Sequence, residues 1–441
     1  MALSEPVEDP VYPDVGDPRV DALHYDLDLD WDPAARELSG RQVLTFRAAA
    51  GTDHFQLDLG EPLVVDEATL DGEPVAVERR GKDLVVRAPL EEDDRHELAL
   101  TYSGTPEPVP APTTRGDFDA LGWTITEDGE TWTMQEPYGA YTWYAVNDQP
   151  ADKALYDIEV SVPAPWVGVA NGELVERTEA AGVVSTSWHL AEPASSYLVT
   201  LATGELTLTE DESASGVPLT YWTPTDRPDL PRRLARTPEL LAWVEERLGP
   251  YPFDTLGIVV VDSRSGMETQ TMITLGDTDY TTSPEVIVHE LVHQWWGNQV
   301  SPRDWSELWM NEGMAMYLQW VWQAEEYALS DADFEAYLDD RALEEAALRT
   351  QAGPFGAYDP EQFGVSNVYY GPALMWHEVR RLLGDDAFWD LVRAWPAARD
   401  NATTDRHDFL AWAEDRTQTS LTDLLDAWLL SPTSPPRGGG G

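Results

Sequence analysis

Hydrophobic and polar residues alternate through most of the first half of the chain. Such alternation is typical of β-strands that bury one face. Turn sequences such as Leu70-Asp71-Gly72 and Ala170-Asn171-Gly172 separate the runs and favour hairpins. The pattern therefore predicts an antiparallel, all-β domain over residues 17–205. In its clearest run, the hydrophobic residues Tyr25, Leu27, Leu29 and Trp31 alternate with Asp26, Asp28 and Asp30.

The spacing of hydrophobic residues changes after about residue 205. A continuous apolar run at residues 256–261 predicts a buried strand, whereas most later segments have the spacing of amphipathic helices. We therefore expect a second, mainly α domain over residues 206–430, and the predicted fold class is α+β. The helices expected in this domain cover residues 240–248, 310–328, 331–350, 373–383 and 421–430.

The two ends of the chain lack either pattern. Residues 1–16 are expected to form an N-terminal tail, and the first dozen of them to be disordered. Residues 431–441 combine Ser434-Pro435-Pro436-Arg437 with four glycines, a composition that does not favour a helix or a strand. We expect this segment to be a disordered tail.

The charge of the chain excludes several classes of partner. Its 441 residues contain 81 Asp and Glu against 28 Lys and Arg, a net charge of −53. Nucleic acids and anionic membranes are bound through cations, so neither is an expected partner. The composition is nevertheless 42% hydrophobic with 19 Trp, which is enough to form a large core. The acidic residues therefore coat a folded protein.

The basic residues add a second property. Only two of them, Lys82 and Lys153, are lysines, and the composition resembles that of proteins from salt-accumulating halophiles. Concentrated salt screens repulsion between surface carboxylates, so we expect stability to require salt.

The sequence also suggests a cellular location. Without cysteine the chain has neither disulfides nor Cys-ligated metals. It has no apolar run near the length of a membrane span, and its first residues do not resemble a secretion signal. We expect a cytoplasmic protein; its oligomeric state stays open, with a monomer as the expectation.

A helix is predicted after Thr282. Either Thr282 or Ser283 can cap it, Pro284 suits its first turn, and Gly297-Asn298 is expected to end it. Within this helix His289 and His293 are four residues apart and so lie on one face.

The predicted helix carries the H-E-x-x-H zinc motif, since Glu290 follows His289 directly. The alternative is a pair of core or surface histidines that happen to flank a glutamate. A zinc hydrolase needs a third protein ligand and one open position. Glu312, nineteen residues after His293 in an apolar stretch, is the candidate third ligand. Its alternative role is that of one more surface acid.

These residues have a definite chemistry if they hold zinc. Two neutral imidazoles and one carboxylate leave positive charge on the metal, which acidifies water bound to it. Glu290 can then accept a proton from the water and return it to a leaving amine. The predicted reaction is amide hydrolysis. Glu307 is a candidate hydrogen-bond acceptor for a ligating histidine, although an exposed acid is equally consistent with the sequence.

The motif and its surroundings closely resemble the gluzincin aminopeptidases, the family of alanyl aminopeptidase and leukotriene hydrolase. The resemblance is carried by HELVHQWWGN at residues 289–298 and WSELWMNEGMA at residues 305–315. It extends to residues 24–29, 135–140 and 147–154, and covers about residues 17–430. It implies an N-terminal β-saddle domain, a thermolysin-like catalytic domain, and one Zn²⁺ per chain held by His289, His293 and Glu312.

The resemblance also implies how substrate is held. The family has a G-x-M-E-N motif, and here Gly266, Met267 and Glu268 match while Thr269 replaces Asn. The family's glutamate binds the substrate's free ammonium, so Glu268 inherits this role, and Glu136 aligns with a second amine-binding position. Without the resemblance, each would be read as a solvated acid. Substrate is expected to lie extended along the preceding strand edge.

A tyrosine donor to the developing oxyanion is the last residue that the resemblance implies. The family places it before a Lys/Arg-Gly pair, and here Gly371-Pro372 stands instead. Counting back from the downstream helix selects Tyr369, with Tyr370 as the fallback and a core aromatic as the alternative role.

Together these features predict a zinc aminopeptidase that acts on short peptides with a free N-terminus. The chain ends soon after its catalytic half, which leaves the limit on substrate length open. Two alternatives remain: a gluzincin endopeptidase, and an inactive family member that serves as a binding module.

Overall fold

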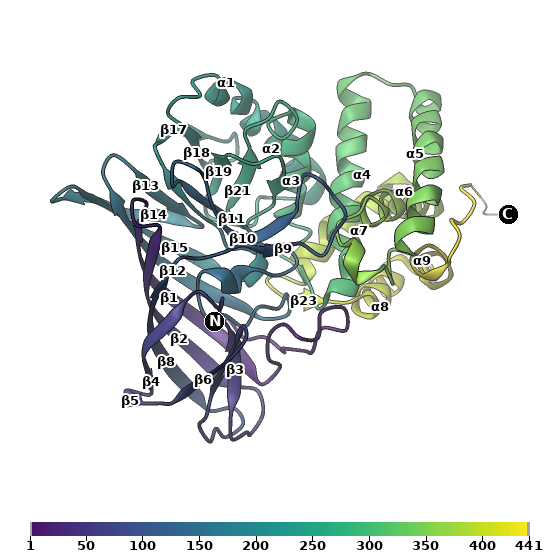
Figure 1. Ribbon diagram of the computed structural model, residues 1–441. Coiled ribbons are helices and arrows are strands. Elements are labelled where there is room, and N and C mark those ends of the chain that lie inside the picture. Colours follow the sequence, from purple (N-terminus) through teal and green to yellow (C-terminus); the bar gives the residue numbers. More distant parts are fainter. Residues whose placement is uncertain (1, 439–441) are drawn as a thin grey trace.

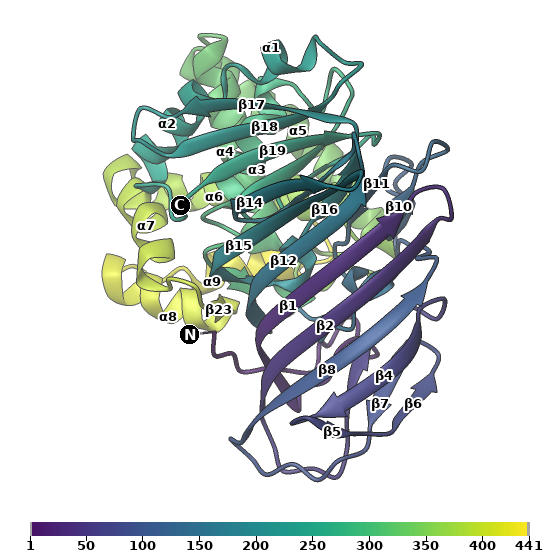
Figure 2. The ribbon, with the colours of Figure 1, turned by 90° about the vertical axis from the view of Figure 1, so that its left-hand side faces the viewer.

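The computed structural model describes residues 2–438, in which a β-rich N-terminal part is followed by a mixed and mostly helical part (Figure 1). This order confirms the predicted fold class. The largest sheet has eight strands, which lie side by side in Figure 2. In spatial order they are β14 (Glu173–Ala180), β15 (Val183–Ser195), β12 (Lys153–Pro163), β1 (Val20–Asp32), β2 (Glu37–Ala48), β8 (Arg95–Gly104), β4 (Val64–Leu70) and β5 (Glu73–Pro74).

The alternation in β1 has its predicted consequence, because Leu27 and Leu29 are buried and Asp28 between them is exposed. The all-antiparallel prediction is wrong at one place, since β1 pairs with β12 in parallel, with Leu27 opposite Ile158. Alternation is the same in parallel and antiparallel strands. The two strands are also far apart in the chain, so no hairpin fixes their relative direction.

Two smaller sheets complete the N-terminal part. The predicted turn at Asp71-Gly72 joins β4 to β5, with both residues at positive φ. The turn at Asn171-Gly172 instead connects strands of different sheets. The five-stranded sheet contains β13 (Val167–Ala170), β16 (Leu201–Gly204), β11 (Thr131–Met134), β10 (Ala120–Ile125) and β9 (Val109–Pro110); the three-stranded sheet contains β3 (Phe55–Asp58), β7 (Asp83–Val86) and β6 (Val77–Arg80).

The second part is built on another five-stranded sheet, whose edge strand β20 (Gly266–Met267) lies beside the site described below. The predicted strand at 256–261 is β19 (Leu256–Val261). The other strands are β17 (Leu206–Glu212), β18 (Pro218–Pro224) and β21 (Met272–Gly276), and a separate pair is formed by β22 (Ser301–Pro302) and β23 (Thr403–Thr404).

Most helices of this part lie to one side of the sheet and extend away from it (Figure 1). The helices are α1 (Leu230–Leu234), α2 (Thr237–Leu248), α3 (Pro284–His293), α4 (Trp309–Glu326), α5 (Asp331–Ala352), α6 (Asn367–Leu383), α7 (Asp385–Ala398), α8 (Arg406–Thr417) and α9 (Thr422–Leu430). The helices expected at 240–248, 310–328, 331–350 and 421–430 are present to within a few residues, α6 begins earlier than expected, and α1, α7 and α8 were not among those named from the sequence.

Helix α6 begins six residues before the predicted start at residue 373 and contains Pro372. Proline normally breaks a helix interior. Here its ring packs against α4, where a Cβ on Gly313 would lie 2.5 Å from the Cβ of Pro372. Pro372 thus lies where α4 and α6 pack closely together. Sequence rules for helices consider only local residues, so they do not include such a contact between two helices.

The N-terminal segment is held in place by hydrogen bonds, in contrast to the predicted disorder. Asp9 is 3% exposed, and its carboxylate accepts hydrogen bonds from the backbone N–H groups of Val11 and Tyr12 and, across the molecule, of Trp305. These backbone donors fix the segment without a helix or strand. At the other end, Arg437 pairs with Glu335 at 2.7 Å. Residues 439–441 of the predicted disordered tail lie outside the described residues.

Two findings bear on the expected surroundings of the protein. Among residues 2–438, no helix has both the length and the hydropathy that a membrane span requires. Arginine supplies most cations of the ion pairs, and many of these pairs lie on the surface.

One ion pair is buried in the helical part. Nε of Arg349 donates to Glu345 at 2.6 Å, and the two side chains are 1% and 0% exposed. Nη1 of Arg349 also donates to the carbonyls of Trp428 and Ser431 at 2.9 and 2.8 Å. The pair therefore ties α5 to the end of α9.

Arg349→Met leaves the Glu345 carboxylate buried without its cation, so we expect the free energy of unfolding to fall by about 3–5 kcal/mol. Urea denaturation in concentrated KCl measures this quantity. The matched control is Arg416→Met, which breaks the exposed pair with Asp390 and is expected to cost about 1 kcal/mol or less. Equal costs for the two variants would contradict the prediction.

Candidate metal centre

Helix α3 presents the two histidines of the motif from its last two turns. Ser283 is the N-cap residue and Pro284 the first helical residue, as predicted, although the Ser283 side chain makes no capping hydrogen bond. The helix ends at His293 instead of the predicted Gly297-Asn298. The His293 carbonyl accepts a hydrogen bond from the N–H of Asn298, so the chain turns back at once.

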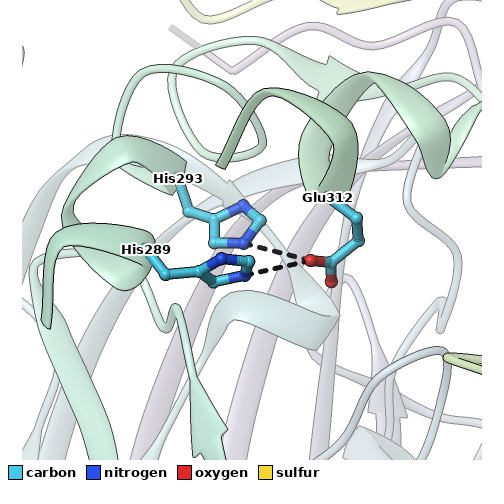
Figure 3. A group of neighbouring side chains, drawn as sticks. All are labelled: His289, His293 and Glu312. Carbon is cyan, nitrogen blue, oxygen red and sulfur yellow. Dashed lines mark hydrogen bonds and ion pairs between the residues drawn. The ribbon is translucent and has the colours of Figure 1, made fainter. Parts of the chain in front are cut away.

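The side chain of Glu312 points from the first turn of α4 toward both histidines (Figure 3). Its Oε2 lies 3.2 Å from Nε2 of His289 and 3.4 Å from Nε2 of His293. All three residues are buried. The structure thus brings together the three predicted ligands from two helices.

This geometry fits a zinc ion. Tetrahedral zinc with bonds of about 2.0–2.1 Å keeps its ligand atoms about 3.3 Å apart, close to the two distances from Glu312. The donor set of two imidazoles and one carboxylate is also that of catalytic zinc sites, which leave the fourth position for water or substrate.

One histidine has an identifiable supporting hydrogen bond. Nδ1 of His293 lies 3.2 Å from the carbonyl oxygen of Trp296, so a His293 that ligates through Nε2 can donate its other N–H there. The predicted supporting role of Glu307 is not observed, because its carboxylate accepts from the indole N–H of Trp309 at 2.7 Å. The hydrogen-bond acceptor for the ligating histidine is therefore a backbone carbonyl and not the expected carboxylate.

Glu290 lies against the edge strand β20. A Cβ built on Gly266 would stand only 2.7 Å from Oε1 of Glu290. Glycine at this position therefore leaves the space that the Glu290 carboxylate occupies. Glu268, Glu290 and His293 also have ligand atoms within 4.8 Å of one another, so Glu290 lies beside the metal ligands.

The two predicted amine-binding glutamates meet in the same place, although they come from different parts of the chain. Oxygens of Glu136, Glu268 and Glu312 lie within 4.8 Å of one another. Oε1 of Glu136 and Oε1 of Glu268 are buried and have no hydrogen-bond partner among the described residues. Buried carboxylate oxygens normally have donors, so this pair is suited to a ligand that carries N–H groups.

The backbone around Glu268 is fixed by residues that follow the zinc motif. Its carbonyl accepts hydrogen bonds from the side chains of Asn298 at 2.7 Å and Gln294 at 3.1 Å. Thr269, which replaces the family's Asn, bonds instead with the Met272 carbonyl and the Thr274 hydroxyl inside the sheet. Its side chain therefore supports the β20–β21 turn.

The electrostatics of the site favour a cation. Burial raises the pKa values of Glu136, Glu268 and Glu290, and repulsion between neighbouring carboxylates adds to this. Burial opposes the charged form of His293, but the carboxylates of Glu268 and Glu312 outweigh it and raise its pKa to about 10. For Glu312, the two histidines outweigh burial and lower its pKa. Positive charge is therefore stabilised at the centre of this cluster.

The two candidate tyrosines have different surroundings at the start of α6. The ring of Tyr369 lies 6.0 Å from that of His289, and its hydroxyl accepts a hydrogen bond from Arg115 at 3.0 Å. The Tyr370 ring packs against Trp320 at 5.6 Å. Both side chains line the site cavity, but only Tyr369 is in ring contact with a predicted metal ligand.

Arg115 was missed by sequence reasoning. It comes from the N-terminal part and lines the same cavity, which measures about 320 Å³. No local pattern distinguishes it from the other 25 arginines, because its contacts with the catalytic part are with Gly364 and Tyr369, about 250 positions away.

Comparison with known families agrees with this geometry. The "Peptidase M1 N-terminal domain" model matches residues 21–198, and the "Peptidase family M1 domain" model matches residues 232–428. The chain belongs to peptidase family M1. The M1 match spans His289, His293 and Glu312, and the N-terminal match spans Glu136.

Solved structures extend the likeness to the whole chain. An M1 zinc metallopeptidase mutant of Deinococcus radiodurans, bound to a Tyr-Ser-Ala substrate, is 26% identical with a TM-score of 0.87. The match covers 98% of this chain and 99% of that one. A two-domain M1 zinc metallopeptidase mutant bound to L-tryptophan matches with 27% identity, the same coverage of both chains and a TM-score of 0.86.

Curated relatives are longer than this chain. Aminopeptidase B of Mus musculus is 28% identical over 67% of this chain and 49% of its own length. Glutamyl aminopeptidase of Sus scrofa is 25% identical over 75% of this chain and 38% of its own length. The chain thus matches half or less of these two relatives.

The space at Gly266 gives a direct test of the placement of Glu290. In Gly266→Ala the new methyl group meets the movable end of Glu290, so we expect little loss of stability but a displaced carboxylate. Turnover of an aminoacyl anilide should fall about 10- to 100-fold, with the melting temperature and zinc content nearly unchanged. Gly51→Ala, where a Cβ meets nothing closer than 3.8 Å, is the control and should keep full turnover.

Proposed function

We propose that the protein is a zinc aminopeptidase that removes the first residue from short peptides. The observation that carries this proposal is the pair of buried, unpartnered carboxylate oxygens of Glu136 and Glu268 beside the His-His-Glu cluster. A peptide's N-terminal ammonium has three N–H donors for these oxygens and a positive charge that opposes the negative charge of the carboxylates. Fixing the ammonium next to the metal centre selects the bond after the first residue.

His289, His293 and Glu312 would hold one Zn²⁺ per chain. Bound zinc would supply a Lewis acid that acidifies water and polarises the scissile carbonyl. Glu290 then acts as the general base that takes the proton from the attacking water. The same carboxyl group returns the proton to the leaving amine.

Strand β20 offers the edge along which a peptide can lie. It is the last strand of its sheet and pairs with β21 on one side only. An extended peptide can therefore add to its free edge through main-chain hydrogen bonds. Gly266 and Met267 would form this edge between Glu290 and Glu268.

Tyr369 is proposed to donate its hydroxyl hydrogen to the oxygen of the scissile carbonyl as negative charge develops there. Its ring contact with His289 supports this choice over Tyr370. Donors of this kind act on the transition state, so the residue is expected to affect kcat more than KM.

The size of the cavity supports a short substrate. A volume of about 320 Å³ is at the lower end of the range for ligand pockets. The Deinococcus radiodurans relative has been solved with a tripeptide, and similar two-domain M1 zinc metallopeptidase structures contain single amino acids. The acidic lining favours apolar or basic first residues over acidic ones.

Blocking the N-terminal amine of the substrate distinguishes an aminopeptidase from an endopeptidase. We expect a free tripeptide to be cleaved and its N-acetylated form to resist cleavage, because acetylation removes the ammonium. Glu268→Gln should raise KM for the free peptide at least about tenfold. Efficient hydrolysis of the acetylated peptide would instead favour the endopeptidase.

Glu290→Gln tests the catalytic base in the same assay. Turnover should fall by about 10²-fold or more with zinc retained, as measured by elemental analysis. Glu285→Gln, which neutralises a carboxylate in the first turn of the same helix, is the matched control. A folded protein that binds no zinc and hydrolyses nothing would support the inactive binding module.

We also propose that the protein is a monomer adapted to a salt-rich cytoplasm, which its net charge of −53 and scarcity of lysine support. Raising KCl from about 0.1 M to about 3 M shortens the range of charge repulsion from about 10 Å to below about 3 Å. The melting temperature should therefore rise steeply between these concentrations. An unchanged melting temperature in calorimetry would contradict the salt adaptation.

A further inference from the structure

Arg115 belongs to the loop between β9 and β10, yet its guanidinium contacts the catalytic part of the chain. Nη1 donates to the hydroxyl of Tyr369 at 3.0 Å and to the carbonyl of Gly364 at 3.2 Å. Nη2 and Nε donate to the carboxylate of Asp117 at 2.8 and 3.3 Å. Each guanidinium nitrogen thus has a partner, and three groups fix its orientation.

The segment before α6 is shaped to allow this contact. Gly364 has a φ of +63°, in the region that favours glycine. A Cβ at this position would lie 3.1 Å from Nη1 of Arg115 and 3.9 Å from the Tyr369 hydroxyl. Glycine therefore allows both the backbone turn and the close approach of the guanidinium.

The direction of the hydrogen bond determines what the Tyr369 hydroxyl can do. A guanidinium has only donors, so the Tyr369 oxygen must be the acceptor. Its own hydrogen is then free to donate elsewhere, and among residues 2–438 no acceptor for it is found at hydrogen-bonding distance. A hydroxyl that accepts from a cation is also a stronger donor, because hydrogen bonds in a chain polarise one another.

We propose that Arg115 is a positioning residue that holds the Tyr369 hydroxyl as a donor directed into the cavity. The inference rests on the function proposed above, in which that hydroxyl stabilises the oxyanion. It adds that the N-terminal domain supplies a residue for the catalytic step, beyond its contribution to amine binding. Arg115 itself does not contact the reacting atoms.

The test compares variants of Arg115 with a neighbour that makes a similar interdomain contact. In Arg115→Gln we expect kcat for a free tripeptide to fall about tenfold, with KM changed by less than about twofold. Arg115→Lys keeps a cationic donor and should recover part of kcat. Thr114→Val is the matched control, since Thr114 donates to Gln362 at 2.9 Å across the same boundary without reaching Tyr369. It should leave both constants unchanged.

A double-mutant cycle separates positioning from general structural support. If Arg115 acts through the hydroxyl, Arg115→Gln should have almost no further effect on kcat in a Tyr369→Phe background. Zinc content and melting temperature of each variant exclude metal loss and unfolding as the cause. Additive effects, a change mainly in KM, or an equal loss in Thr114→Val would overturn the inference.

The same measurements distinguish failure of this inference from failure of the proposed function. A wild type that hydrolyses aminoacyl anilides and free tripeptides, together with an additive cycle, would overturn the role of Arg115 alone. A zinc-loaded wild type that hydrolyses neither would overturn both.

Discussion

Buried negative charge around one point is the constraint on which this structure depends. Glu136, Glu268, Glu290 and Glu312 are each at most 6% exposed and share one cavity. Buried carboxylates are costly unless cations or donors face them. In the function proposed above, a metal ion and a substrate ammonium neutralise them, and the fold holds them together around one cavity. Two helices, one edge strand and a segment of the N-terminal domain together do so.

Those parts of the site that follow from regular secondary structure could be predicted from the sequence. His289 and His293 lie four residues apart on one helix, and that spacing alone puts both rings on one face. Strand β19 followed from a continuous apolar run. The pairing of Glu136 with Glu268 required the family resemblance, because no periodicity connects residues so far apart. The structure brings them together as that resemblance implies.

The remaining features depend on contacts between distant segments, which local patterns do not encode. The parallel pairing of β1 with β12 and the proline within α6 are two examples. Glu307 was expected to accept a hydrogen bond from a ligating histidine, but its carboxylate accepts one from the nearby indole N–H of Trp309 instead. Rules about sequence neighbours could not select Arg115, since the two partners that connect it to the site, Gly364 and Tyr369, belong to the other domain.

The interdomain contacts also explain why the two domains form one functional unit. Nζ of Lys153, one of only two lysines, is buried and donates to the carbonyl of Asn298 at 2.7 Å. The Asn298 side chain in turn donates to the carbonyl of Glu268. Burial lowers the pKa of Lys153 to about 7, so the fold places an ammonium group at a costly position. Through Asn298, this costly contact connects the N-terminal domain to the backbone of Glu268. The N-terminal domain therefore helps to fix the proposed amine-binding site in addition to lining it with Glu136.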